Sequence, residues 1–251
     1  DSAYKSLVKY LDEQKIDLSK ISWMEMLFIL NKINSTACKA LISSGALDYL
    51  KLSRNRMLFE YQAFSELTNK ESSILSTIMT KNKSLEYNLQ QLYSQNIMAK
   101  RKTAILDLIN SLKNPPFSLE DTIDWIVDTE YSLLGCSISC NKVDSYDTSM
   151  INYTCQDFKK NKIFSGGSFL LVGELENINV TKTKKGKDAG AEMAFITLSD
   201  GTAVLDNVIC FPDTYKEYRN QLFQGNVVVV KGNKSKNKDS FIVEKIYIPK
   251  T

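Results

Sequence analysis

The 251-residue sequence contains no histidine at all. This absence excludes Ser-His-Asp and Cys-His catalysis, and it excludes metal hydrolases that depend on histidine ligands. The five cysteines are odd in number and irregularly spaced, which is typical of reduced thiols in the cytoplasm. Cys136 and Cys140 are four residues apart, but a zinc site would need two more ligands of a type that this chain barely has. We therefore expect no metal and no cofactor in this chain.

Long apolar runs are also missing. The longest apolar stretch extends from Met26 to Leu30, whereas a transmembrane helix needs about 20 apolar residues. The sequence shows no charged-then-apolar leader of the kind that directs secretion. We expect a protein that does not associate with a membrane and that resides in the cytoplasm.

The net charge of +3 becomes informative when it is divided along the chain. Residues 161–251 carry 13 Lys and Arg against 10 Asp and Glu, while residues 1–160 are neutral with 19 of each. Eight of the 13 basic residues fall in two short stretches: Lys182, Lys184, Lys185 and Lys187, then Lys231, Lys234, Lys236 and Lys238. Such clustering indicates contact with a polyanion more strongly than the net charge does.

Residues 1–112 are expected to form a helical region. Apolar residues recur at helical spacing between Tyr4 and Leu11 and again at Trp23, Leu27 and Leu30. A further helix is expected to begin at Ser35 and to end near Gly45, which suits a helix C-cap. A long polar helical stretch is expected over roughly 54–112, before the Pro115-Pro116 pair breaks it.

Residues 113–168 are expected to form a helical linker. The pattern Ser118-x-x-Asp121 predicts the start of a helix that carries Trp125 and Val127. A polar segment then extends to Ser168, beyond which the apolar period becomes two and β-branched residues dominate.

The C-terminal part, residues 169–251, is expected to be a five-stranded barrel. Five strands are predicted, with a short helix over 214–222 between the third and the fourth: 169–180, 192–198, 203–211, 226–232 and 241–248. Three strands, a helix and two strands is the order of an OB barrel. The predicted fold class is therefore α+β, with an all-helical N-terminal region followed by a five-stranded OB-fold barrel.

The two lysine stretches fall in the loops that such a barrel uses for binding. In an OB barrel the face of strands 2 and 3, with the loops between strands 1–2 and 4–5, binds oligonucleotides. One lysine-rich loop is as well explained by a solvated hairpin tip, but two such loops on one end of the barrel favour phosphate contact. Phe195 and Phe211 are the candidates for stacking on bases, with burial inside the barrel as the alternative.

The sequence motifs of the predicted barrel also resemble those of a known family. Thr183-Lys184-Lys185-Gly186-Lys187 is followed by Met193-Ala-Phe-Ile-Thr-Leu-Ser-Asp200, by a strand ending in Phe211-Pro212, and by Val230-Lys231-Gly232. This series resembles the OB domain of the alpha subunit of DNA polymerase III, the bacterial family C replicative polymerase. The first loop is a few residues longer here than in that family.

Two upstream segments resemble the same family in the same order. Glu130 to Ser139 matches its E-x-x-x-L-G-x-x-(L/I)-S pattern, although the His-Pro that usually follows is missing. Ala40 to Asp48, followed by Asn55-Arg56, is similar to the segment that closes the family's helix-hairpin-helix region, here near 34–56.

The resemblance implies roles for several residues of the helical region. The helix-hairpin-helix region of the family contacts duplex DNA, so the amides of the Gly45 turn would face a phosphate, with Lys39, Arg54 and Arg56 as supporting charges. A helix cap is the alternative at Gly45. The family's peptide for the sliding clamp lies farther on, and the nearest candidate is Gln91-Leu92-Tyr93, with a solvated helix face as the alternative.

The resemblance implies a non-catalytic, DNA-binding, C-terminal portion of a replicative polymerase, or a separately encoded piece of a split one. The palm carboxylates of the family lie N-terminal to this region, so the chemistry would belong to another part. Single-stranded and duplex DNA, the sliding clamp and a separate catalytic part are the implied partners, in a bacterial or phage-infected cell. The alternatives are a stand-alone single-strand-binding or regulatory protein, an RNA-binding OB module and a structural scaffold.

Overall fold

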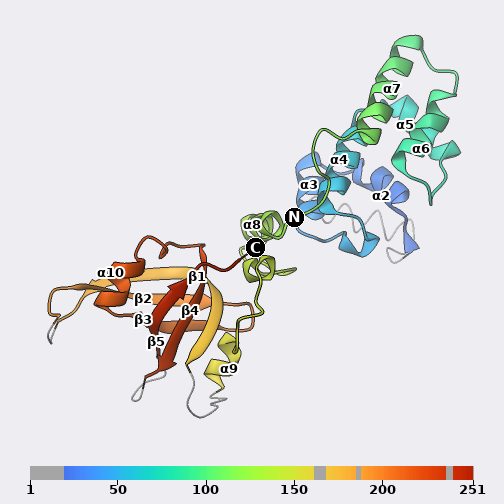
Figure 1. The fold of residues 1–251 in the computed structure, drawn as a ribbon. Coiled ribbons are helices and arrows are strands. Elements are labelled where there is room, and N and C mark those ends of the chain that lie inside the picture. The colour runs from blue at the N-terminus through green and yellow to red at the C-terminus, as the bar shows by residue number, and fades with distance from the viewer. Residues whose placement is uncertain (1–19, 161–167, 185–187, 236–239, 251) are drawn as a thin grey trace. The chain divides into compact units, whose positions relative to one another are not determined.

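The computed structural model describes residues 20–160, 168–184, 188–235 and 240–250 of the chain (Figure 1). The chain divides into two units, Asp1–Ser139 and Cys140–Thr251. The predicted linker over 113–168 is thus shared between them, since its first part packs with the helices and its second part with the barrel.

The described part of the first unit is helical, as predicted, whereas the helix expected between Tyr4 and Leu11 lies outside the described residues. Its α-helices are α2 (Trp23–Leu30), α3 (Ser35–Ser43), α4 (Arg54–Ser65), α5 (Asn69–Ile78), α6 (Leu85–Tyr93), α7 (Ala99–Lys113) and α8 (Ile123–Leu134), with a 3-10 turn, η2 (Asp48–Leu50), before α4. The stretch over 54–112 is not one long helix but four. The side chains of Thr68 and Ser84 cap α5 and α6 by accepting from the backbone N–H of Glu71 and Tyr87, so each helix starts at a sequence-coded site.

A buried ion-pair cluster connects α4 to α8 and to η2. The guanidinium of Arg54, at the start of α4, is 2% exposed and its Nη2 lies 2.7 Å from Asp48 Oδ2 and 2.8 Å from Glu130 Oε1. Gly45 makes room for this group, because a Cβ there would lie 2.2 Å from Arg54 Nη2, and its φ of +81° also favours glycine. The segment from Ala40 to Asp48 and the segment from Glu130 to Ser139, which both resemble the polymerase family, therefore meet at one buried arginine.

Glu130 is wholly buried and fixes the turn that ends α8. Its carboxylate accepts from the backbone N–H of Ile138 and Ser139, at 2.5 and 2.9 Å, after Gly135 has turned the chain at a φ of +80°. Burial by itself would raise the pKa of Glu130, but hydrogen bonds from Ser139, Ile138 and Arg54 outweigh burial and lower this pKa to about 2. The E-x-x-x-L-G-x-x-I-S segment is thus a carboxylate-capped turn.

Asp121 differs from its predicted role. The helix expected to start at Ser118 begins at Ile123, where Thr122 accepts from the backbone N–H of Trp125. Asp121 instead caps α4, because its carboxylate accepts from the backbone N–H of Arg54 at 2.7 Å and of Asn55 at 2.9 Å. A capping residue 67 positions away in the chain cannot be recognised from local sequence spacing.

The second unit contains the closed five-stranded barrel, which confirms the predicted α+β class. Its strands are β1 (Phe169–Lys182), β2 (Glu192–Ser199), β3 (Val204–Cys210), β4 (Val227–Lys234) and β5 (Phe241–Tyr247), closed in the order β1-β2-β3-β5-β4. Helix α10 (Pro212–Tyr218) joins β3 to β4, while the 3-10 turn η3 (Lys142–Ser145) and helix α9 (Cys155–Lys159) precede the barrel. Helices α9 and α10 lie on different sides of the barrel (Figure 1).

Strand β1 closes the barrel because it pairs with two neighbours along its length. Phe169 to Glu174 pair with β4, and Glu174 to Lys182 pair with β2. Where β4 pairs with β5, a Cβ on Gly232 would lie 2.0 Å from the carbonyl oxygen of Ile242. The glycine of the Val230-Lys231-Gly232 segment is therefore required by the close approach of two backbones.

Asp200 anchors the segment before the barrel. Its carboxylate accepts from the Thr202 hydroxyl at 2.6 Å and from the backbone N–H of Cys155 at 2.7 Å, so it holds both the β2–β3 turn and the start of α9. Helix α9 then places the Phe158 ring against those of Phe169 and Phe241, with centroids 5.3 and 5.4 Å away. Residues from Cys140 onward consequently belong to the barrel unit.

We predict that Glu130→Gln destabilises the helical unit by about 3 kcal/mol at neutral pH, because Arg54 loses a buried partner. The lowered pKa of Glu130 means that its contribution is complete above pH ~4.5 and is lost as the pH falls toward ~2, so the difference between the two proteins should shrink over that window. Urea unfolding followed by tryptophan fluorescence reports on this unit alone, since Trp23 and Trp125 both lie in it.

The exposed Glu66 at the end of α4 provides the matched control, and Glu66→Gln should change the unfolding free energy by less than about 0.5 kcal/mol. A Glu130→Gln deficit that is equally large at pH ~3 and pH ~7 would contradict the assignment, since the native ion pair would then not depend on the Glu130 charge.

Candidate nucleic-acid interface

One row of residues crosses the outer face of the barrel from strand to strand. The strand register places Asn179 beside Phe195, Phe195 beside Ile209, Ile209 beside Ile242, and Ile242 beside Asn233. The flanking residues of β2 and β3 point inward and are buried, so this row points outward. We call these five residues the outer row.

Both predicted stacking residues lie on the surface. Phe195 is 40% exposed in the outer row, and Phe211, which follows the buried Cys210 at the end of β3, is 45% exposed. Burial inside the barrel, the alternative for each, is therefore wrong. Alternation could not decide this for Phe195 because its neighbours Ala194 and Ile196 are also apolar, and it is these two that fill the core.

The loop between β1 and β2 carries exposed cations at its described positions. Lys182 and Lys184 are exposed, and Lys182 stands opposite Glu192 in the strand register, which offsets part of its charge. Thr183 closes the loop, because its backbone N–H donates to Ala191 and its carbonyl accepts from Gly190, both at 2.9 Å. Lys185 and Lys187 lie outside the described residues.

The second lysine group continues onto the strands. Lys231 lies opposite Lys245 in the register of β4 and β5, so two cations stand side by side on the surface. Lys234 is half-buried, and its ammonium lies 5.7 Å from the centre of the Phe158 ring. Lys236 and Lys238 lie outside the described residues.

The two lysine loops were expected at one end of the barrel, but they lie on opposite sides of the β2–β3 face. The first loop leads into Glu192, at the start of β2, beside the end of β3. The second leads into Phe241, which pairs with Val208 in parallel, so that this loop approaches from the start of β3. The outer row crosses the face between them.

The helical unit alters several predicted contacts. Arg54 is buried and holds two carboxylates, so it cannot act as a supporting charge for a phosphate. The backbone N–H of Gly45 donates to Ile42 at 3.2 Å, and that of the next residue to Leu41, which assigns the Gly45 turn to a helix cap. Lys39 and Arg56 are exposed, and Arg56 pairs with Glu60 at 2.8 Å.

The expected clamp-binding segment is not presented as one surface. Leu92 is fully buried in the core of the helical unit, because it occupies the inward face of α6. Gln91 and Tyr93 are exposed, and the ammonium of Lys102 lies 5.4 Å from the centre of the Tyr93 ring. An apolar pair that could enter a partner's groove is therefore absent at this position, and we do not propose clamp binding through it.

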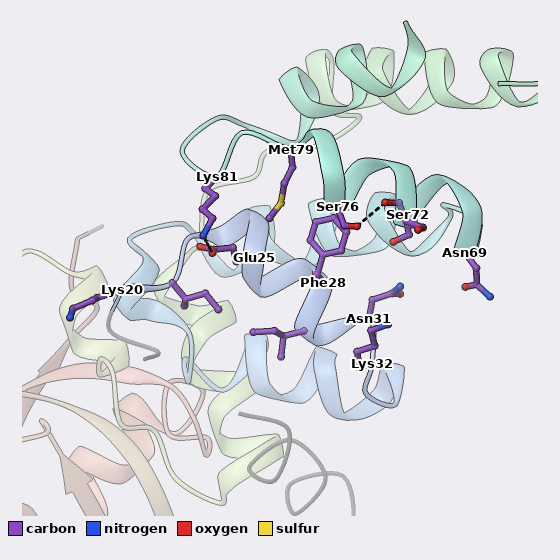
Figure 2. Close-up of a pocket in the computed structure, with 13 residues that line it drawn as sticks. Lys20, Glu25, Phe28, Asn31, Lys32, Asn69, Ser72, Ser76, Met79 and Lys81 are labelled. Carbon is purple, nitrogen blue, oxygen red and sulfur yellow. Dashed lines mark hydrogen bonds and ion pairs between the residues drawn. The ribbon is translucent and has the colours of Figure 1, made fainter. Parts of the chain in front are cut away.

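A cavity of about 860 Å³ lies between α2 and α5. Figure 2 shows Glu25 and Phe28 of α2 opposite Ser72 and Ser76 of α5, with Lys81 paired to Glu25 at 2.5 Å. Its size is within the range of small-molecule sites. No motif pointed to it, because serines and lysines on helix faces are typical of solvated surfaces.

The described ranges contain no group of three or more His, Cys, Asp or Glu side chains that could hold a metal ion. Asp200 is occupied by its hydrogen bonds to the β2–β3 turn and to α9. None of the helices in these ranges is long and apolar enough to cross a bilayer.

Three residues of the interface were not predicted from the sequence. Ile209 lies beside Phe195 in the outer row and Ile242 lies beside Ile209, while Lys245 adds a second positive charge next to Lys231. Each lies in an ordinary strand pattern, so only the register across three strands reveals the group. A signal was present for Lys245, because it follows Glu244 as a second charged residue in an otherwise apolar strand.

Comparison with known proteins agrees with the motifs. No family model matches the chain. DNA polymerase III subunit alpha of Borreliella burgdorferi is 30% identical over 120 residues, which cover 47% of this chain and 10% of that protein. The same subunit of Aquifex aeolicus is 24% identical over 222 residues, or 87% of this chain and 15% of that protein. The chain thus spans a small part of its relatives' length, and its resemblance to the alpha subunit of DNA polymerase III is confirmed.

Proposed function

We propose that this chain is a non-catalytic DNA-binding portion of a replicative polymerase of the DNA polymerase III alpha type, and that its barrel binds single-stranded template. The outer row carries the proposal. In this row Phe195 is exposed beside the half-buried Ile209, the exposed Lys182 and Lys184 lie at the end of β1 and just after it, and the relatives named above are polymerase subunits.

The proposed binding combines stacking with phosphate contact. Phe195 and Phe211 offer exposed aromatic faces to unstacked bases, which any base can use because each has a π-face. Lys182 and Lys184 on one side, and Lys231 and Lys245 on the other, would follow the sugar-phosphate backbone. This part of the binding depends neither on the polarity of the DNA strand nor on its base sequence.

For the helical unit we propose a weaker, non-specific contact with duplex DNA through Lys39 and Arg56. Both lie on the surface, but Arg56 is already paired to Glu60, and the Gly45 amides are used in a helix cap. The catalytic part would be a separate region or a separate chain that supplies the metal-binding carboxylates.

An RNA-binding OB module is the second candidate, because a stacking platform with lysines accepts either nucleic acid. A titration against single-stranded DNA, single-stranded RNA and duplex DNA, each at about 50 and 200 mM salt, separates the possibilities. We expect the tightest and most salt-sensitive binding to single-stranded DNA. Equal or tighter binding to RNA would favour the second candidate, and no binding to single strands would contradict both.

We predict that the double substitution Phe195→Ala and Phe211→Ala weakens single-stranded DNA binding at least about tenfold, because each stacked base contributes roughly 1–3 kcal/mol. Fluorescence anisotropy with a labelled oligonucleotide measures the change. Phe223→Ala is the control, since Phe223 is even more exposed, at 57%, but lies in the loop after α10, and its substitution should leave the affinity unchanged. A loss of equal size in the control would show that exposed phenylalanines act non-specifically.

We also predict that Lys231→Ala with Lys245→Ala lowers the salt dependence of binding. Two phosphate contacts on a single strand contribute about 1.4 to the slope of log K against log salt, so the slope should fall by about that amount. Lys70→Ala with Lys100→Ala, on exposed positions of the helical unit, removes the same charge as a control. An equal decrease of the slope in both double variants would assign the effect to net charge instead of to this surface.

A further inference from the structure

A bulge in β3 presents two polar side chains on the same face as Phe195. Ile196 pairs with Val208 and Leu198 pairs with Leu205, so Thr197 of β2 faces both Asp206 and Asn207 of β3. A bulge of this kind turns side chains away from the regular alternation and is common beside functional sites. Both polar residues are exposed.

The bulge borders a small cavity of about 230 Å³. Three of the residues that line it are apolar and buried: Phe158 of α9, Leu205 of β3 and Phe241 of β5. Asp206, Asn207, Lys159 and Lys234 complete the lining. The volume is below the roughly 300–1,000 Å³ of sites for drug-sized molecules, so it suits a single flat base more than a larger ligand.

The charge of Asp206 conflicts with simple phosphate binding. A carboxylate on a surface that follows a polyanion repels phosphates and lowers non-specific affinity. The same carboxylate is favourable where the ligand presents N–H donors, because a carboxylate accepts hydrogen bonds and donates none. Its position on the β2–β3 face therefore indicates contact with base edges and not with the backbone.

Guanine is the base whose edge fits this group. Its N1–H and N2–H donors are adjacent and can bind both oxygens of one carboxylate, whereas adenine, cytosine and thymine each place an acceptor next to their donor. The guanine O6 acceptor lies beside N1 and suits a lysine ammonium, which Lys159 and Lys234 bring to the same cavity.

We propose that the cavity beside the β3 bulge is a guanine-selective subsite of the single-strand interface, with Asp206 accepting from the base and Lys234 or Lys159 donating to its O6. This inference rests on the proposed single-strand binding and adds a base preference to it. Asn207, the second bulge residue, has an amide that can donate and accept at the same edge.

The test uses the full chain and single strands of about 12 thymidines, within the site size of about 4–16 nucleotides for an OB barrel, with one central dG, dA, dC or deoxyinosine. We expect the dG strand to bind at least about fivefold more tightly than the unsubstituted strand, since a bidentate base contact discriminates by roughly 1–3 kcal/mol. Deoxyinosine lacks the N2 amino group and should lose most of this preference.

Asp206→Asn should abolish the dG preference while binding to the thymidine strand is kept or improved, because a repelling charge is removed. Asp213→Asn on α10 removes the same charge from an exposed site away from the cavity and should keep the preference. Binding of all strands without a dG preference, or a preference that survives in Asp206→Asn, would overturn the subsite alone. Failure to bind any strand would overturn the proposed function together with it.

Discussion

The buried guanidinium of Arg54 is the interaction on which the helical unit depends. It is held by Asp48 of η2 and Glu130 of α8, and it approaches Gly45 so closely that no side chain fits there. A charge out of contact with water is tolerated only when its partners are in place, so the network sets the positions of several elements together. Arg54 and Gly45, which the sequence suggested as DNA contacts, are therefore explained by their part in this buried network.

The barrel depends on a different constraint, the closure of five strands around a continuous apolar core. Closure fixes the register, and the register decides that Ala194 and Ile196 point inward while Phe195 points outward. Gly232 permits the close approach of the β4 and β5 backbones. The outer row, the paired lysines of β4 and β5 and the β3 bulge all follow from this one register.

Strand order, helix content and the barrel itself could be predicted from the sequence, because periodicity and turn residues are local signals. The partners of individual charged side chains could not be predicted. Arg54 looked like a phosphate ligand because its partner Glu130 is 76 positions away, and Asp121 looked like the start of its own helix because it caps α4 from a distance. Leu92 looked exposed in a polar sequence, yet it occupies the inward face of α6.

The central claim is that the β2–β3 face of the barrel contacts single-stranded nucleic acid. Photo-cross-linking to an oligonucleotide that carries 5-bromodeoxyuridine, followed by mass spectrometry of the cross-linked peptides, tests it most directly. The account predicts cross-links at or beside Phe195 and Phe211, since a stacked base lies against these rings. Cross-links confined to the helical unit, or to barrel surfaces away from β2 and β3, would contradict it.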